Sequence, residues 1–384
     1  MTATFPPKTI SPFSDATPPV DDLVVIPHPH PSGLTPEQLD SFGLEMDALR
    51  EELLQARGES DANYIRRVIH LQRRLEVAGR AALFAGVLPP FWLAGTTMLA
   101  LAKILENMEI GHNVMHAQWD WMRDPDIHSS TWEWDNTCPA DQWKHSHNEM
   151  HHMWTNVLGR DRDVGYSVLR MSDDQPWTKA TRFQPAYAAL LALLFDLGVA
   201  FHDLEIEHVV DGTKSKEQAQ AQLKAIGAKI GRQSLKDYVV FPALAGPFFF
   251  PVLTGNLAAN VARNLWSFTI IFCGHFPDGV AQFTDADVEN ETRGGWYARQ
   301  VLGSANIAGG KLLDLLSGNL SYQIEHHAFP DLPSNRYAEV APRVRELCER
   351  HGLPYNTGSL PKQFGSVVRR IVRLARKPAE PASG

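Results

Sequence analysis

The feature that most constrains the fold of this 384-residue chain is a set of histidine clusters in three distant segments. The first is GHNVMH at 111–116, the second is HSHNEMHH at 145–152, and the third is QIEHH at 323–327. On an α-helix, residues four positions apart share a face, with Cβ atoms about 6 Å apart, so two such imidazoles can bind one metal ion. The fold must therefore bring three separate segments together around a metal site.

The histidines are too numerous for a single ion, which favours a dinuclear centre. Adjacent histidines such as His151 and His152 lie about 100° apart around a helix and suit two neighbouring ions better than one. Nitrogen ligands of this kind are typical of iron, copper, zinc or nickel. The candidate ligands, which also act as catalytic residues through the metals, are His112, His116, His147, His151, His152, His275, Gln323, His326 and His327.

Other histidines have weaker claims. His145 shares a helix face with His152 but lies two turns away, roughly 10 Å by helix rise, so the two could not easily bind one ion. His202 and His208 stand beside an apolar stretch, where a histidine is more often an ordinary packed residue. The sequence allows these three residues as metal contacts but does not require them.

A carboxylate-rich di-iron site is the alternative within the metal class. Glu109 with His112, and Glu149 with His152, have the ExxH spacing that soluble di-iron bundles use on two of their helices. That arrangement leaves most of the other clustered histidines without a role. The histidine-rich site is therefore the preferred hypothesis.

Four apolar stretches suggest a membrane protein. They lie at 81–108, 185–204, 238–253 and 257–275, and the arginine-rich segment 66–80 before them is typical of a cytoplasmic flank. None is a clean run of twenty apolar residues, so a buried helix of a soluble bundle is the alternative for each. All histidine clusters must lie on one side of the membrane. An even number of crossings must then separate the second cluster from the third, so the charged stretch at 185–204 is expected not to cross.

The predicted fold class is all-α. We expect an integral membrane protein with about four transmembrane helices in two hairpins, near 81–108 and 238–275, and a cytosolic helical cap that holds the dinuclear metal site. The expected domains are a disordered tail at 1–34, a membrane domain at 35–360 and a basic tail at 361–384. The first 20 residues lack the apolar core of a signal peptide, so no cleavage is expected.

Local signals predict two helices outside the apolar stretches. Thr35, Pro36 and Gln38 form a capping-box start for a helix that should run to Arg57. Residues 336–350 read as an amphipathic helix that ends at Gly352. The basic run RRIVRLARK at 369–377 fits either an anionic membrane surface or a solvated helical face.

Composition excludes some classes of protein. The net charge is −8 and the pI is near 6.0, which does not suit a nucleic-acid surface. The three cysteines are far apart and form no CxxC pair, as expected in a reducing compartment.

The clusters resemble the three histidine boxes of membrane fatty-acid desaturases. The matching motifs are HNVMH, HNEMHHMWTN followed by GRDRD, and QIEHH followed by FPDLP, and the resemblance covers roughly residues 60–360. NMEIGHNVMHAQWDWM and FCGHFPDG are more narrowly similar to the actinobacterial stearoyl-CoA delta-9 branch. The second box departs from the pattern because three residues precede HH where many members have two. The third begins with Gln323 where many have His, as in front-end desaturases.

The resemblance implies a specific chemistry. It implies a di-iron centre on the cytosolic side of the cytoplasmic membrane, with the box histidines and His275 as ligands. The implied reaction is the O₂-dependent formation of a cis double bond, at delta-9, in a long acyl chain carried by CoA or lipid. No GxGxxG with the right context appears, so electrons should come from a separate ferredoxin or flavoprotein NAD(P)H reductase. The alternatives are a membrane hydroxylase of alkanes or lipids, and a non-enzymatic metal-binding membrane protein.

Residues near the boxes are candidates for supporting roles. Neutral imidazole ligands need acceptors that fix their tautomers. The candidate acceptors are Asp120, Glu149, Asp161, Asp163 and Glu325. The tryptophans that could line an acyl tunnel, or lie at a membrane interface, are Trp119, Trp121, Trp132 and Trp134.

Overall fold

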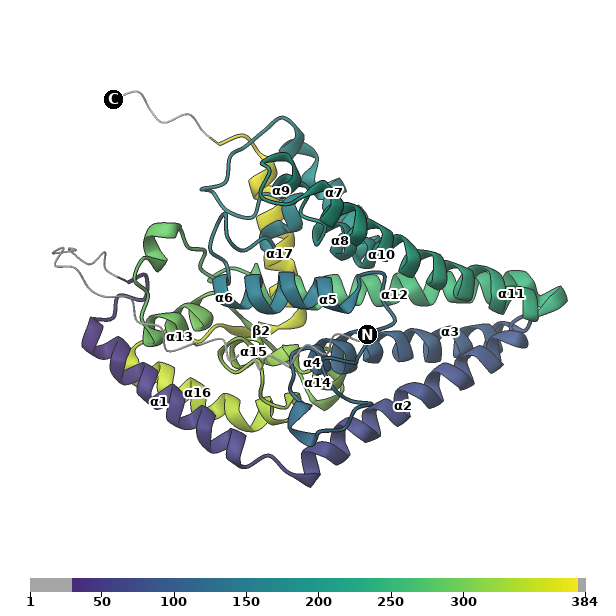
Figure 1. Ribbon diagram of the computed structural model, residues 1–384, viewed down its shortest axis with the longest axis horizontal. Coiled ribbons are helices and arrows are strands. Elements are labelled where there is room, and N and C mark those ends of the chain that lie inside the picture. The colour runs from purple at the N-terminus through teal and green to yellow at the C-terminus, as the bar shows by residue number, and fades with distance from the viewer. Residues whose placement is uncertain (1–29, 379–384) are drawn as a thin grey trace, which may run out of the picture.

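A computed structural model describes residues 30–378 and shows a mostly helical chain (Figure 1). The helical class is as predicted, except that two three-residue strands, β1 (Asn306–Ala308) and β2 (Thr357–Ser359), pair in parallel. Most of the predicted tail at 1–34, and the end of the predicted basic tail, lie outside the described residues.

The helices include α-helical, 3₁₀ and π segments. The α-helices are α1 (Pro36–Gln55), α2 (Glu59–Phe84), α3 (Pro89–Ile104), α4 (Asn113–Met115), α5 (Ala140–Trp143), α6 (His152–Trp154), α7 (Gln184–Leu193), α8 (Phe195–His202), α9 (Ile206–Val210), α10 (Lys216–Ser234), α11 (Phe241–Leu244), α12 (Phe249–His275), α13 (Arg293–Leu302), α14 (Lys311–Leu316), α15 (Gln323–Ala328), α16 (Tyr337–His351) and α17 (Leu360–Ala375). The π-helices are η1 (Leu105–His112), η3 (Lys144–His151) and η6 (Leu235–Val240). The 3₁₀ turns are η2 (Asp120–Met122), η4 (Val164–Ser167), η5 (Ala180–Phe183), η7 (Gly246–Phe248), η8 (Asp285–Val288), η9 (Leu320–Tyr322) and η10 (Ser334–Arg336).

Both helix boundaries with strong local signals are confirmed. The Thr35 hydroxyl accepts a hydrogen bond from the Gln38 N–H, and the Gln38 side chain accepts one from the Thr35 N–H, which completes the capping box of α1. At the other predicted boundary, α16 ends at Gly352 with φ 72°, a left-handed conformation that glycine adopts readily. Helices α1 and α16 pack together with α13 around a core that contains Phe42 and Tyr297.

Two helical hairpins lie side by side and converge at one end of the molecule (Figure 1). Helices α2 and α3 form one hairpin, and the consecutive helices α10, η6 and α11 form the other with α12. The first hairpin is tightly packed, because a Cβ atom on Gly95 would lie 2.9 Å from the backbone oxygen of Gly79. The hairpins are joined by a hydrogen bond of 3.1 Å from the Trp92 indole N–H to the Thr254 hydroxyl.

A buried cluster of charged side chains links the two hairpins. Asp237 accepts hydrogen bonds from Lys103 at 2.7 Å and from Arg80 at 3.1 Å. Beyond this cluster, residues 81–102 and 238–262 contain no charged side chain. We call these two segments the hairpin tips. Exposed apolar side chains on the tips are Phe84, Val87, Leu88, Phe91, Leu93, Val239, Val240, Leu244, Phe248, Phe250 and Leu257.

The predicted set of about four transmembrane helices in two hairpins, with a separate cytosolic cap, is wrong. Within residues 30–378, no helix combines the length and the apolar character needed to cross a membrane. Helix α3 has 16 residues, which span about 24 Å at 1.5 Å per residue against a hydrocarbon core of about 30 Å. Helix α12 has 27 residues, but polar side chains interrupt it, including Asn256 and Arg263.

The remaining apolar stretches are broken into short helices. The stretch at 185–204 is divided between α7 and α8, and the stretch at 238–253 is divided among η6, α11, η7 and the start of α12. Apolar composition over a sequence window therefore overstated the length of continuous helix.

Helix α17 carries the basic run near the C-terminus. Its Val367 and Ile371 side chains are buried in a core cluster that includes residues of α7 and α12. Arg369 and Arg373 pair with carboxylates at the protein surface. These contacts favour the solvated helical face over the membrane-surface alternative for this segment.

Candidate metal centre

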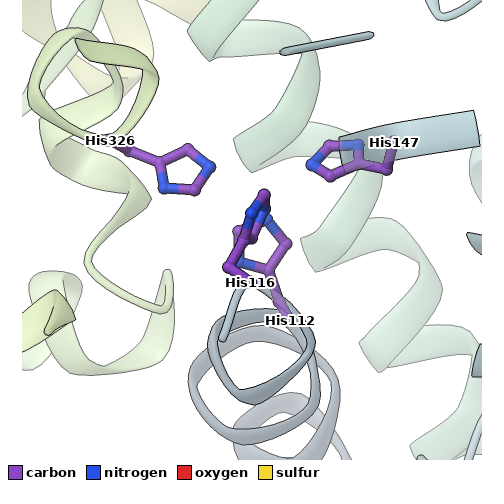
Figure 2. Close-up of side chains that lie close together, drawn as sticks. All are labelled: His112, His116, His147 and His326. Carbon is purple, nitrogen blue, oxygen red and sulfur yellow. The ribbon is translucent and has the colours of Figure 1, made fainter. Parts of the chain in front are cut away.

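Four histidines from three segments point toward a common centre (Figure 2). His112 ends η1, His116 follows α4, His147 lies on η3 and His326 lies on α15. One ring nitrogen from each lies within 4.8 Å of those of the others. Three further groups meet the same distance criterion: His151 with His275 and His327, His152 with His326 and His327, and His147 with His151 and Asp163. The fold thus gathers all eight predicted histidines, and their role as ligands stays a prediction.

π-Helical turns change the expected geometry of the second cluster. Segment η3 has i→i+5 hydrogen bonding, so residues five apart lie near one face. His147 is consequently as close to His152, with ring centroids 4.9 Å apart, as to His151 at 5.0 Å. His152 lies between the first and third boxes. Its ring centroid is 4.6 Å from that of His116 and 4.3 Å from that of His327.

The donor atoms suit metal ions. Within residues 30–378, the Nε2 atoms of His116, His147 and His326 are buried without a hydrogen-bond partner, as are both ring nitrogens of His152. Burial lowers the pKa of His112 to about 3, and it also lowers the pKa of His116, His147 and His152. Neutral imidazoles with free nitrogens are the form that binds transition metals.

Two of the five predicted carboxylates contact the histidines. His151 Nδ1 donates to Asp161 at 3.0 Å, and His147 Nδ1 lies 3.4 Å from Asp163. Burial alone would lower the pKa of His151, but the Asp161 carboxylate reverses this and raises it. Asp163 also accepts from His202 at 3.1 Å, so His202 supports the site through a carboxylate.

The other three carboxylates bind elsewhere. Asp120 accepts hydrogen bonds from Ser129, and Glu325 accepts from Asn306 and Tyr355. Glu149 pairs with the exposed His145. These contacts take Asp120, Glu325 and Glu149 away from the histidine groups, so the prediction that they orient ligands is wrong.

Several supporting residues were missed from sequence. His112 Nδ1 lies 3.0 Å from the Asn113 side-chain oxygen, and His327 Nδ1 lies 3.1 Å from both the Gln300 oxygen and the Thr155 hydroxyl. The Tyr337 hydroxyl is 3.3 Å from His326 Nδ1. Asn113 and Thr155 are close to the boxes in sequence and could have been found. Gln300 and Tyr337 come from other elements, with no local signal.

The weaker alternatives find no support in the geometry. His145 is exposed, and His208 contacts Thr213, so neither belongs to the histidine groups. Glu109 of the first ExxH pair is held by Ser334 and Asn319. Neither ExxH carboxylate therefore joins the metal groups among the described residues.

Gln323 lies inside the site, and its role as a ligand stays a prediction. Its Nε2 atom is 2.9 Å from His275 Nε2, while its Oε1 atom is buried without a partner in the described part of the chain. The side chain packs against Gly274, where a Cβ atom would lie 2.9 Å from the Gln323 amide carbon. The glycine thus leaves room for the amide beside His275.

A cavity extends from the histidines into the molecule, and we call it the inner cavity. The Trp143 ring stacks on His147 with centroids 4.3 Å apart and lines this space. Of the four tryptophans singled out from sequence, Trp134 lines it, whereas Trp119 is buried in a separate core cluster. Ring side chains beside buried histidines form a site that can enclose an apolar chain.

The known proteins that are similar to this chain are fatty acid desaturases. Residues 88–359 match the family described as fatty acid desaturase. An NADPH-dependent stearoyl-CoA 9-desaturase of Mycobacterium tuberculosis is 49% identical over 360 residues, which cover 93% of this chain and 83% of the relative. A Delta(8)-fatty-acid desaturase of Euglena gracilis is 27% identical over 392 residues, covering 94% and 86%. An sn-1 linoleoyl-lipid 6-desaturase of Synechocystis is 25% identical over 280 residues, covering 71% and 77%.

The chain belongs to the fatty acid desaturase family. It is therefore an oxidoreductase of lipid metabolism, and its histidine clusters are suited to hold the metal that this chemistry needs.

Proposed function

We propose that this enzyme uses O₂ to introduce a cis double bond at the delta-9 position of a long saturated acyl chain carried by coenzyme A. The observation that carries the proposal is the convergence of eight histidines, seven of them buried and His147 half-buried, beside a cavity that four of them line. The substrate and the bond position are supported by the name of the relative that is 49% identical.

We propose iron as the metal, with two ions. The group around His112 and the group of His151, His275 and His327 could each hold one ion. Iron with O₂ supplies an oxidant for a methylene C–H bond, which has no acidity for a base to use. In the balanced reaction, one saturated acyl chain, O₂, two electrons and two protons give one alkene and two water molecules.

The protein itself orients and shields the site. Asp161 fixes the ring of His151, and the contact of Asp163 does the same for His147. Burial keeps the remaining rings neutral, so their lone pairs are available to a metal. The apolar walls of the inner cavity exclude water from the acyl chain.

Electrons are proposed to come from a separate ferredoxin or flavoprotein reductase that uses NADPH. The support is that the relative of 49% identity is described as NADPH-dependent, together with the lack of a dinucleotide-binding motif in this sequence. Addition of a purified reductase should restore turnover to the purified enzyme.

Expression in a host that lacks delta-9 desaturation tests the proposed function. With a matched reductase present, we expect new unsaturation at delta-9 in total fatty acids, and iron bound to the purified protein. Wild-type protein that forms an alcohol would indicate a hydroxylase. Bound metal without O₂-dependent product would indicate a metal-binding protein that is not an enzyme.

We also propose that the enzyme acts at the cytoplasmic membrane, with the histidine site facing the cytosol. The support is the charge-free surface of the hairpin tips, since contiguous exposed apolar patches mark contacts with lipid or protein. Basic residues of α2 and α10 lie on the same two hairpins and would favour an anionic leaflet.

A further inference from the structure

The inner cavity has two chemically different ends. One face of α12 lines it, with Arg263, Ser267, Ile271 and His275 spaced four residues apart. The distance along the helix from Arg263 to His275 is roughly 18 Å. Aromatic and aliphatic side chains surround the histidine end, including Tyr166. The far end of the cavity, at Arg263, is lined by polar side chains, whereas an acyl chain is apolar.

The polar end consists of two groups of hydrogen-bonded side chains. The Asn136 amide donates to the Asn107 oxygen at 2.6 Å, and the Asn107 amide donates to the Ser267 hydroxyl at 3.0 Å. Arg263 and Asn264 donate to the Asp196 carboxylate at 2.6 and 2.9 Å. We call these residues the polar end of the cavity: Asn107, Asn136, Asp196, Arg263, Asn264 and Ser267.

Two atoms of the polar end have no partner. Nε of Arg263 and Oδ1 of Asn264 make no hydrogen bond to any residue between 30 and 378, and these residues are only 2% and 5% exposed. A buried polar atom without a hydrogen-bond partner destabilises the fold, so a bound group is expected there. Because Asp196 already balances the charge of Arg263, a neutral acceptor fits better than an anion.

A second, polar pocket of about 340 Å³ adjoins the polar end. Trp134 lines both spaces. Glu106 and Asp135 face the second pocket, whereas their neighbours Asn107 and Asn136 face the inner cavity. A polar carrier group attached to an acyl chain would therefore have room beside the polar end, in a pocket lined by both basic and acidic side chains.

We propose that the polar end binds the carbonyl group of the acyl substrate, with the Nε–H of Arg263 as the donor. The acyl chain then runs along α12 toward His275, and the distance from Arg263 to the histidines sets which carbons are oxidised. The opposite orientation would place an apolar methyl group against a buried ion pair and three asparagines. The inference rests on the proposed acyl-carrier substrate.

A binding experiment without reductant tests the proposal, because it needs no turnover. The probes are stearoyl-CoA and its thioether analogue S-octadecyl-CoA, which lacks the carbonyl oxygen. We expect wild type to bind the thioester roughly tenfold more tightly. Arg263→Lys keeps the charge but removes the Nε–H, and it should bring the two affinities close together. Arg80→Lys, at a buried pair outside the cavity, should keep the preference.

An unchanged preference in Arg263→Lys, or none in wild type, would overturn the proposal. If Arg263→Lys does not fold, the position of the double bond in the products of the wild-type enzyme tests the proposal instead. With a shorter and a longer acyl-CoA, a bond at constant distance from the carbonyl supports the proposal, and one at constant distance from the methyl end overturns it. If wild type forms no alkene yet shows the Arg263-dependent preference, the proposed function fails and the carbonyl site stands.

Discussion

At the scale of single residues, the hydrogen-bond partner of Nδ1 determines how firmly a histidine ring is held. His151 and His147 face carboxylates, His112 and His327 face side-chain amides, and His326 faces a tyrosine hydroxyl. A carboxylate partner makes an imidazole more basic and fixes its tautomer. His147 and His151 are therefore the most firmly held rings of the site.

Asp163→Asn should weaken metal binding. The substitution removes the negative charge shared by His147 and His202, and loss of such a partner typically costs 10–100-fold in metal affinity or activity. Bound iron per chain and turnover would measure the loss. Glu149→Gln is the matched control, because Glu149 contacts only the exposed His145 among the candidate histidines, and it should retain both.

His147→Ala should abolish activity and lower bound iron, since its unpartnered Nε2 faces the other histidines. His145→Ala should have little effect, because that ring is exposed and pairs with Glu149. Iron analysis and product formation in parallel would separate the two. Equal losses would contradict the assignment of His147 to the metal groups.

Glu109→Gln should change how stability depends on pH. Burial raises the pKa of Glu109 to about 8, so the folded protein keeps this proton after the unfolded chain has lost it. Stability should fall by up to about 1.4 kcal/mol per pH unit from near pH 5 to pH 8. Unfolding measured across this range should show a shallower fall in Glu109→Gln. The exposed variant Glu346→Gln should keep the wild-type slope.

The structure brings together the residues whose spacing stood out in the sequence, although their role as ligands stays a prediction. The three boxes and His275 were found because their histidines stand out in the chain, and Asp161 and Asp163 because they closely follow the second box. Gln300 and Tyr337 were not predictable, since only tertiary packing brings them to the rings. The same holds for Arg263 and Asp196 in the inner cavity.

At the scale of elements, the capping signals of α1 and α16 were reliable because they depend on a few neighbouring residues. The membrane helices were not, because apolar windows do not reveal where a helix breaks, as it does among η6, α11 and η7. The π-helical turns were also missed. Spacing arguments assumed 3.6 residues per turn, whereas η1 and η3 are wider.

Asp237→Asn should destabilise the paired hairpins. Asp237 balances Lys103 and Arg80 in a buried setting, and removal of one partner from such a pair costs about 3–5 kcal/mol. Denaturant unfolding would measure the change. Asp173→Asn, which breaks an exposed pair with Arg373, should cost no more than about 1 kcal/mol. Similar losses in both variants would contradict a special role for the buried cluster.

At the scale of the whole molecule, the hairpin tips lie together at one end, away from α1 and α16 (Figure 1). Phe91 and Phe250, 48% and 71% exposed, are among their largest apolar side chains. The double change Phe91→Asp with Phe250→Asp should reduce sedimentation with anionic phospholipid vesicles at least tenfold, because burying one such ring in lipid contributes about 1.5–3 kcal/mol. Leu312→Asp, equally exposed on α14, is the control and should bind like wild type.

The dispersion of the ligands along the chain has a consequence for biosynthesis. His112 and His116 are synthesised 214 and 210 residues before His326. At common translation rates, this delay is about 10–40 s. During that time, the nascent polypeptide carries histidine pairs that can capture whatever cation is abundant. The groups that contain His326 or His327 are therefore complete only after the third box has been synthesised.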